Sequence, residues 1–157
     1  IIVDATAGLG RDAFLLASLG AVVTLIERND KMHTLLQDGI KKAMNEGGEY
    51  LEIAQRMTLL HGDARDLLPT LSPDVVLVDP MHPPRKKTAL VKNEMRLIRE
   101  IVGTDEDSIE LMNVALATAH KRVVLKWPKQ ADPMEGLRRA SHQIVGKSTR
   151  YDVFMVS

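Results

Sequence analysis

The sequence contains no cysteine in its 157 residues, which excludes a disulfide framework and thiolate metal sites. Aromatic residues make up only 3% of the chain, so few side chains are available to stack on a flat ligand. No apolar run approaches the roughly 20 residues that span a bilayer, and no signal peptide is visible. We therefore expect a cytoplasmic protein with no membrane partner.

A chain of this length can bury roughly two-thirds of its unfolded surface in one domain. Its first residue, Ile1, already lies in an apolar run typical of a strand, with no capping element before it. We therefore expect residues 1–157 to form one domain, and an N-terminal part of the full protein to be missing from the sequence.

The net charge is zero, but the charges are unevenly distributed along the chain. Residues 1–79 carry 7 basic and 12 acidic side chains, and residues 80–157 carry 14 basic and 9 acidic ones. The second half is therefore positive by five charges, and the first half is negative by five. Such a distribution favours a surface that faces a polyanion, although ordinary solvated helices also give it.

Apolar strands alternate with amphipathic helices along the chain, which is typical of an α/β domain with a mostly parallel sheet. We expect strands at residues 1–3, 21–26, 57–60, 74–78, 122–126, 142–146 and 151–156, the last two forming an antiparallel hairpin. We expect one helix to begin at residue 11 and a short one to end at Pro69, and further helices at residues 30–44, 50–56, 91–102, 108–119 and 133–140. Asp30 is the expected N-terminal cap of the helix at 30–44, and Asp105 or Asp107 that of the helix at 108–119.

The segment 1–12, I-I-V-D-A-T-A-G-L-G-R-D, reads as a strand, a tight glycine loop and the start of a helix. Gly8, Gly10 and Ala13 fit the G-x-G-x-x-G/A pattern, in which the backbone approaches a ligand at a helix N-terminus. Glu27 lies at the end of the next apolar run, where a carboxylate suits ribose hydroxyls. The pattern alone fits NAD and S-adenosylmethionine equally well, and a turn without a ligand is a third interpretation.

Four carboxylates follow the ends of the first four predicted strands: Asp4, Glu27, Asp63 and Asp79. Parallel strands end at one edge of a sheet, where α/β domains bind their ligands. Each carboxylate alone is explained by a helix cap, but four at one edge indicate a binding site.

The fourth predicted strand leads into a proline-rich loop, D-P-M-H-P-P, at residues 79–84. A basic tract follows it, and its cationic side chains are Arg85, Lys86, Lys87, Lys92, Arg96 and Arg99. A loop that holds a carboxylate beside a run of cations fits a site for a nucleic-acid base, with the cations on the phosphates.

This layout resembles the class I S-adenosylmethionine-dependent methyltransferases, and D-P-x-x-P resembles their amino-methylating motif. More closely, D-A-T-A-G-L-G-R-D-A at 4–13, D-P-M-H-P at 79–83, K-T-A-L-V-K-N-E-M-R at 87–96 and K-R-V-V-L-K-W-P at 121–128 resemble one family, the bacterial small-subunit ribosomal RNA guanine-N2 methyltransferases known as RsmJ. The sequence departs from that family's usual residues at Asp63-Ala64, His82 and Trp127.

The resemblance implies a Rossmann-like, mostly parallel seven-stranded sheet with helices on both faces and a C-terminal antiparallel hairpin. It implies S-adenosylmethionine as cofactor and 16S rRNA, or the small ribosomal subunit, as partner. The implied cofactor-binding residues are Gly8, Gly10, Arg11 and Asp12 on the methionine side, Glu27 and Arg28 at the ribose, Asp63 and Ala64 at the adenine, and Asp79 at the transfer point. The implied RNA-binding residues are Arg85, Lys86, Lys87, Lys92 and Arg96.

The guanine N2 nitrogen is a poor nucleophile because its lone pair is delocalised into the ring. Asp79 and the Pro80 carbonyl are the candidates to accept its two hydrogens, in a loop that proline stiffens. His82 could stack on the base or merely complete the loop, and Trp127 could stack or pack in the core. Methyl transfer from a sulfonium needs no metal, and the five histidines lack ligand spacing.

Three other functions are compatible with parts of the pattern. A nicotinamide-dependent oxidoreductase would use the same glycine loop, but it gives no reason for Asp79-Pro80 followed by a basic tract. A non-catalytic RNA-binding module could keep the fold. An N-methyltransferase acting on DNA adenine or on a small molecule would share the D-P motif.

Overall fold

The computed structural model describes residues 1–80 and 105–156. Its strands are β1 (Ile2–Asp4), β2 (Val23–Glu27), β3 (Met57–His61), β4 (Val75–Val78), β5 (Arg122–Pro128), β6 (His142–Val145) and β7 (Thr149–Met155). The helices in the described ranges are α1 (Arg11–Ser18), α2 (Asp30–Glu46), α3 (Gly48–Gln55), α4 (Ala64–Leu71) and α6 (Asp105–Thr118).

The seven strands form one sheet in the order β3-β2-β1-β4-β5-β7-β6. The first five strands are parallel to one another, and β7 pairs antiparallel with both β5 and β6. The predicted seven-stranded sheet with a C-terminal antiparallel hairpin is therefore confirmed. The strand order reverses between β1 and β4, because β2 and β3 lie on one side of β1 and β4 and β5 lie on the other. Such sheets bind their ligands at this point.

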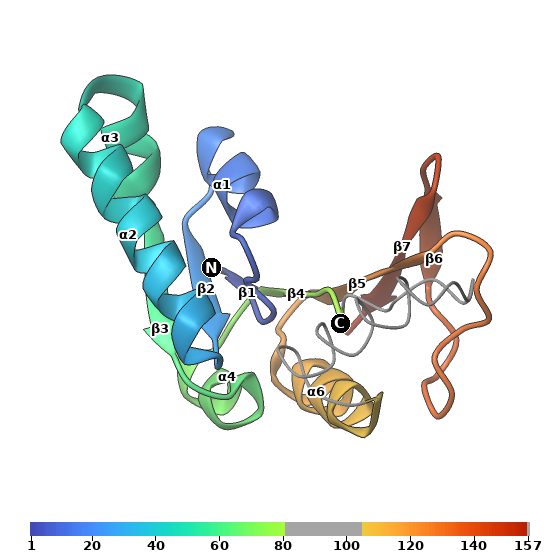
Figure 1. Ribbon diagram of the computed structural model, residues 1–157. Coiled ribbons are helices and arrows are strands. Elements are labelled where there is room, and N and C mark those ends of the chain that lie inside the picture. The colour runs from blue at the N-terminus through green and yellow to red at the C-terminus, as the bar shows by residue number, and fades with distance from the viewer. Residues whose placement is uncertain (81–104, 157) are drawn as a thin grey trace, which may run out of the picture.

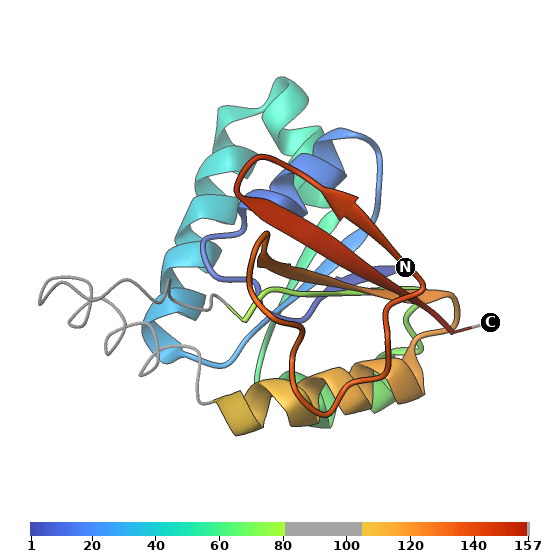
Figure 2. The ribbon, with the colours of Figure 1, turned by 90° about the vertical axis from the view of Figure 1, so that its right-hand side faces the viewer.

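Helices cover both faces of the sheet, as predicted (Figures 1 and 2). On one face, α1, α2 and α3 bury small and branched side chains such as Ala13, Ala17 and Leu25. On the other face, α4 and α6 pack on β4 and β5 around Leu68, Met112 and the strand side chains that alternate toward them. The glycine loop between β1 and α1 lies at the edge between these two cores.

Several helix boundaries differ from the expected ones for local reasons. Asn29, and not Asp30, caps α2, because its side-chain oxygen accepts a hydrogen bond from the N–H of Met32 at 3.0 Å. The helix α3 begins at Gly48, directly after Gly47, which ends α2. Helix α4 continues past Pro69 to Leu71. A proline there removes one hydrogen bond of the last turn, while the fully buried Leu68 holds the helix on the core.

The expected helix at 133–140 is wrong, because this segment forms turns and irregular backbone. Gly136 in its middle has a φ of +90°, a left-handed conformation that interrupts a right-handed helix. Arg150, buried on β7, holds the chain just before the segment by donating to the carbonyls of Pro128, Lys129 and Ala131. The expected helix at 91–102 lies outside the described residues.

Candidate functional site

The loops that leave β1 and β4 are joined to each other at the carboxyl edge of the sheet. The backbone N–H of Asp79 donates a hydrogen bond to the hydroxyl oxygen of Thr6 at 2.7 Å. The N–H of Thr6 in turn donates to Asp4 Oδ1 at 3.1 Å. The first residue of the proline-rich loop is therefore fixed directly against the glycine loop, although 73 positions separate Asp79 from Thr6 in the sequence.

Asp4 is the most deeply buried carboxylate of this edge, with 4% of its surface exposed. Burial raises its pKa to about 7 from an ordinary value of 3.8; the Thr6 hydrogen bond opposes this shift, and the nearby carboxylates of Asp12, Asp79 and Glu27 add to it. A carboxyl group that titrates near neutral pH beside a pocket favours a cationic ligand, since a positive charge would restore its ionised form.

The two glycines of the loop have different roles. Gly8 is buried, has a φ of +54° and lines the pocket at the carboxyl edge. Gly10 has a φ of +77°, and a side-chain carbon there would come within 2.8 Å of Leu36 Cδ2 on α2. Gly10 and the exposed Arg11 line an apolar groove between α1 and α2, and not the pocket. Gly10 therefore serves the packing of α1 on α2.

The pocket lies between the ends of β1, β2 and β4 and the N-terminal turns of α4 and α6. Small residues of the glycine loop and charged side chains of neighbouring elements line it. The residues that line it are Ala5, Thr6, Gly8, Ile26, Glu27, Arg28, Gly62, Asp63, Ala64, Arg65, Val78, Pro80, Asp107, Ser108 and Leu111. Of the residues expected to bind a cofactor, Gly8, Glu27, Arg28, Asp63 and Ala64 thus share one cavity.

Glu27 is a buried carboxylate that faces this pocket, with 7% of its surface exposed. It ends β2, and its Oε2 accepts a hydrogen bond from the N–H of Asn29 at 3.2 Å. This bond orients the carboxylate at the start of α2. A carboxylate held in this way offers acceptors to a pair of neighbouring hydroxyl groups.

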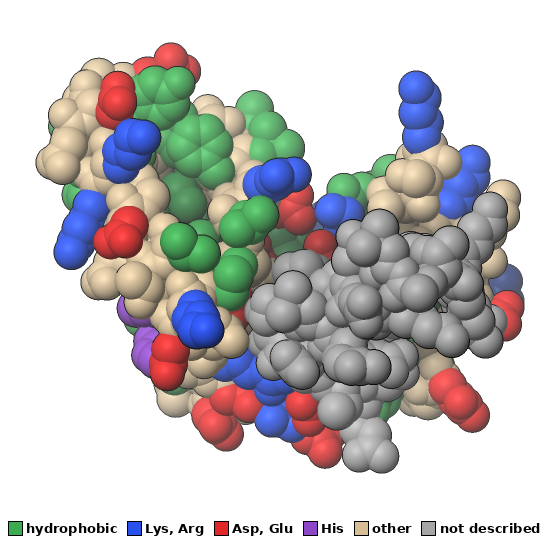
Figure 3. Space-filling view, in the orientation of Figure 1, with side chains coloured by type: hydrophobic (Ala, Val, Ile, Leu, Met, Phe, Trp, Pro, Cys, Tyr) green, Lys and Arg blue, Asp and Glu red, His purple; other side chains and the backbone are tan. Residues whose placement is uncertain are grey.

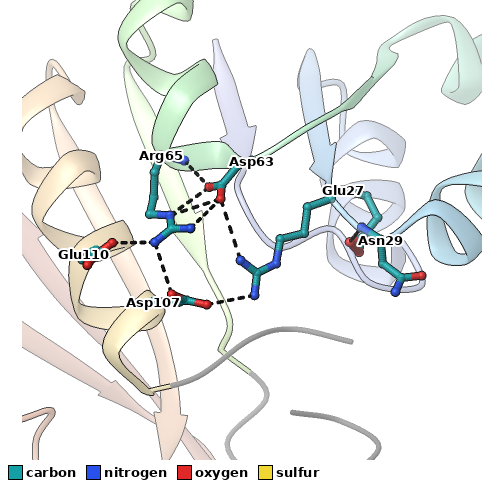
Figure 4. Close-up of polar contacts among 7 residues, drawn as sticks. Glu27, Asn29, Asp63, Arg65, Asp107 and Glu110 are labelled. Atoms are coloured by element: carbon teal, nitrogen blue, oxygen red, sulfur yellow. Dashed lines mark hydrogen bonds and ion pairs between the residues drawn. The ribbon is translucent and has the colours of Figure 1, made fainter. Parts of the chain in front are cut away.

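A network of charged side chains forms the wall of the pocket between α4 and α6 (Figure 4). Asp63 caps α4 by accepting from the backbone N–H of Arg65, and the Arg65 guanidinium also binds both of its carboxylate oxygens, with Nη2 to Oδ2 at 2.6 Å. These bonds hold the pKa of Asp63 below its usual value. Arg65 continues to Asp107 and Glu110 on α6, and Arg28 reaches Asp63 at 3.8 Å and Asp107 at 3.3 Å.

This network changes the expected roles of two residues. Asp63 was expected mainly as an acceptor for adenine, but in the structure it first caps α4 and holds Arg65. Asp107, expected as a possible cap of the following helix, lies inside α6, which begins at Asp105, and pairs with both arginines. This end of the pocket is therefore lined by two guanidinium groups, those of Arg28 and Arg65.

The other end of the edge brings together two further expected residues, Asp12 and Asp79. Lys126 of β5 lies between them, with its Nζ at 3.9 Å from Asp12 Oδ2 and at 3.7 Å from Asp79 Oδ2. Side chains of both charge signs meet in the middle of this face, between the part built from α1–α3 and the part built from β5–β7 (Figure 3). A cation thus holds the helix that begins at the glycine loop against the loop that follows β4.

Some of the expected site residues lie outside the described residues: His82, Arg85, Lys86, Lys87, Lys92 and Arg96. Their roles stay predictions from the sequence. Trp127 is 7% exposed, belongs to the core and donates from Nε1 to the carbonyl of Asp132 at 2.8 Å, so the core-packing interpretation is confirmed.

Sequence reasoning missed Thr6, Arg65 and Lys126. Arg65 had one detectable signal, since it lies two residues after Asp63, the cap of α4, and therefore in the first turn of that helix. Thr6 and Lys126 have none, because their partners lie 73 and 47 or more positions away. Within the described ranges, no group of three or more His, Asp or Glu side chains is placed to hold a metal ion. A search of the same ranges finds no helix with the length and apolar character needed to cross a membrane.

Comparisons with known proteins agree with this geometry. Residues 1–156 match a protein-family model described as "Putative SAM-dependent methyltransferase". A protein of Agrobacterium fabrum named ribosomal RNA small subunit methyltransferase J is 70% identical over 155 residues, which are 99% of this chain and 74% of that protein. A protein of the same name from Brucella anthropi is 71% identical over 154 residues, covering 98% of this chain and 75% of that protein.

A crystal structure of a SAM-dependent methyltransferase from Neisseria gonorrhoeae is also similar, with a TM-score of 0.80 and 39% sequence identity. The similarity covers 98% of this chain and 60% of that one.

Proposed function

We propose a reaction from the premise that the chain belongs to the ribosomal RNA small subunit methyltransferase J family of SAM-dependent methyltransferases. In this proposal it methylates the exocyclic N2 of a guanine in 16S rRNA. The observation that carries the proposal is the hydrogen bond from the backbone N–H of Asp79 to the Thr6 hydroxyl, which fixes the residue that bears the acceptor carboxylate against the glycine loop. Membership of this family also identifies the cofactor that the glycine loop binds as S-adenosylmethionine, and not a nicotinamide nucleotide.

The residues of the pocket suit this cofactor. When bound, S-adenosylmethionine supplies the methyl group on a sulfonium sulfur. Glu27 is buried, oriented and open to the pocket, and it is the residue for the two ribose hydroxyls. Ala64 and Asp63 border the adenine position, where Asp63 can accept a further hydrogen bond only alongside Arg65. At the methionine end, the neighbouring carboxylates of Asp4 and Asp12 would attract the positively charged part of the cofactor.

Asp79 and Pro80 hold the base in this proposal. A carboxylate accepts one N2 hydrogen and a backbone carbonyl accepts the other, so that the positive charge developing on the nitrogen is stabilised. The nitrogen–carbon bond would form as the carbon–sulfur bond of the cofactor breaks, and the methylated nitrogen would then lose one proton to the carboxylate or to water. Pro80 is buried and lines the pocket, which supports a position of this loop beside the cofactor. His82 is the candidate to stack on the base, as the sequence predicts.

The charge of the surface supports RNA as the substrate. The basic tract with Arg85, Lys86, Lys87, Lys92 and Arg96 follows the base-binding loop directly in the sequence. At the same edge of the described sheet, Lys129 follows β5 and Lys147 precedes β7, and both are exposed. Cations around the transfer point can hold phosphates on either side of a target base, and base-edge contacts supply the specificity.

The test is methyl transfer to defined RNA substrates. Small ribosomal subunits and free 16S rRNA from bacteria that lack the corresponding gene would be incubated with the protein and isotopically labelled S-adenosylmethionine. Mass spectrometry of the digested RNA should show one new N2-methylguanosine. Label in adenosine, or in DNA or small molecules but not in RNA, would contradict the proposal. Cofactor binding without any transfer would favour a non-catalytic RNA-binding module.

A further inference from the structure

Lys126 lies on β5 between the start of α1, which follows the glycine loop, and the loop that begins at Asp79. In the register of β4 and β5, Leu125 pairs with Val78, so Lys126 lies beside the residue that follows, Asp79. Its neighbours Leu125 and Trp127 point into the core under α4 and α6. Because side chains alternate along a strand, Lys126 points to the opposite face, where α1 begins.

The ammonium group of Lys126 is held there by two carboxylates from different elements. It lies 3.7 Å from Asp79 Oδ2 and 3.9 Å from Asp12 Oδ2, and its side chain is 32% exposed. Burial acts to lower the pKa of Lys126, but the negative charges of Asp79 and Asp12 outweigh burial and raise the pKa above its usual value. Lys126 is therefore a cation at neutral pH, with Tyr151 as its cross-strand neighbour on β7.

We propose that Lys126 is a positioning residue for methyl transfer, which holds Asp79 and Asp12 in a fixed relation and so aligns the base with the cofactor. The inference rests on the proposed function. Asp12 moves with α1 and the glycine loop, whereas Asp79 begins the loop that receives the base. A misplacement of about 1 Å between two reacting groups can reduce the rate by about 100-fold, so a cation that joins their supports acts on the rate more than on binding.

The experiment compares Lys126→Met, which keeps the length and apolar stem, with Lys126→Arg, which keeps the charge. The single-turnover rate is measured at saturating cofactor and RNA, and the dissociation constants of both ligands are measured separately. We expect Lys126→Met to lower the rate about 10- to 100-fold and to change each dissociation constant less than about threefold. Lys126→Arg should restore the rate to within about fivefold of the wild type.

The matched control is Lys121→Met, at an exposed lysine just before the same strand and at the opposite edge of the sheet. It should leave the rate unchanged. If Lys126→Met lowers the melting temperature, Lys126→Gln and the double variant with Asp12→Asn are measured under conditions where all are folded. A bridging lysine predicts that the effects of the two substitutions on the rate are less than additive.

Three results would overturn the inference. The first is a wild-type rate for Lys126→Met. The second is a parallel loss of rate and cofactor affinity in that variant, which would make Lys126 a cofactor ligand. The third is a failure of Lys126→Arg to restore the rate. The proposed function fails separately, if the wild-type protein itself transfers no methyl group to small-subunit rRNA.

Discussion

Replacing Asp4 by asparagine should stabilise the free protein and weaken its binding of the cofactor. Asp4 is 4% exposed, and its pKa is raised from 3.8 to about 7, chiefly by burial. A shift of about 3 units corresponds to about 4 kcal/mol of unfavourable free energy for the ionised group in the folded state. Asparagine has nearly the same shape and can still accept the hydrogen bond from the Thr6 N–H, but it carries no charge.

The sign of the pH dependence follows from proton binding. Between pH 4 and pH 7 the folded protein holds a proton on Asp4 that the unfolded chain releases, so the contribution of Asp4 to stability falls as the pH rises through this range. Below pH 4 the carboxyl group is protonated in both states and costs nothing. Above pH 7 the full penalty is present. The Asp4→Asn variant should therefore gain up to about 4 kcal/mol over the wild type at pH 8, and much less at pH 5.

Urea unfolding of the wild type and the Asp4→Asn variant at pH 5, 6, 7 and 8 measures this difference. The exposed Asp38 of α2 provides the control substitution, Asp38→Asn, which should show no such trend. Titration calorimetry completes the test, because a cationic cofactor should bind the wild type more tightly as the pH rises to about 7, and the variant should lose this dependence. A stability difference that is the same at all four pH values would refute the reasoning.

Three further predictions concern the cofactor pocket, the loop and the basic tract. Glu27→Ala should weaken cofactor binding by about 1.5–3 kcal/mol in calorimetry, the usual loss for a charged hydrogen-bond partner, and unchanged affinity would remove Glu27 from the ribose site. Gly10→Ala should lower the free energy of unfolding by about 1–3 kcal/mol more than Gly20→Ala. Both glycines have a positive φ, but only at Gly10 would the added carbon come within 2.8 Å of a side chain, that of Leu36. Equal losses in the two variants would contradict this. Replacing Arg85, Lys86 and Lys87 by alanine should reduce the slope of log K for RNA binding against log salt concentration by roughly 2–3, with cofactor affinity unchanged. Replacing Lys41 and Lys42 of α2 should leave this slope unchanged. A wild-type slope in the triple variant would mean that the basic tract is an ordinary solvated surface.

Much of the fold could be predicted from the sequence, because its signals are local or periodic. Alternation of strands and helices, the glycine loop and continuous apolar runs such as the one in β4 each predict an element within a few residues. The choice between Asn29 and Asp30 as helix cap is harder, since either side chain can accept the bond and only the backbone conformation decides. The helix predicted at 133–140 is wrong because Gly136 takes a positive φ and Arg150 holds the chain just before the segment, and neither is visible in a helical pattern.

The site was predictable in its position but not in its contacts. Carboxylates at strand ends follow from the strand pattern, so Asp4, Glu27, Asp63 and Asp79 could be placed at one edge. Their partners come from elsewhere in the chain, as the bond from Arg65 to Asp107 and the position of Lys126 show. Charged side chains on different elements leave no periodic signal, and burial, which raises the pKa of Asp4, depends on the complete packing.

The central claim is that Asp79 stabilises the transition state of methyl transfer to the base, and Asp79→Asn tests it most directly. Asparagine keeps the size and one acceptor but loses the charge. The measurement is single-turnover methyl transfer to small-subunit rRNA at saturating cofactor, since Asp79 is also a proposed cofactor-binding residue. We predict a rate about 100-fold or more below that of the wild type, with a much smaller change in RNA affinity. A near-normal rate would mean that Asp79 only supports the loop, and it would contradict the proposed catalytic role.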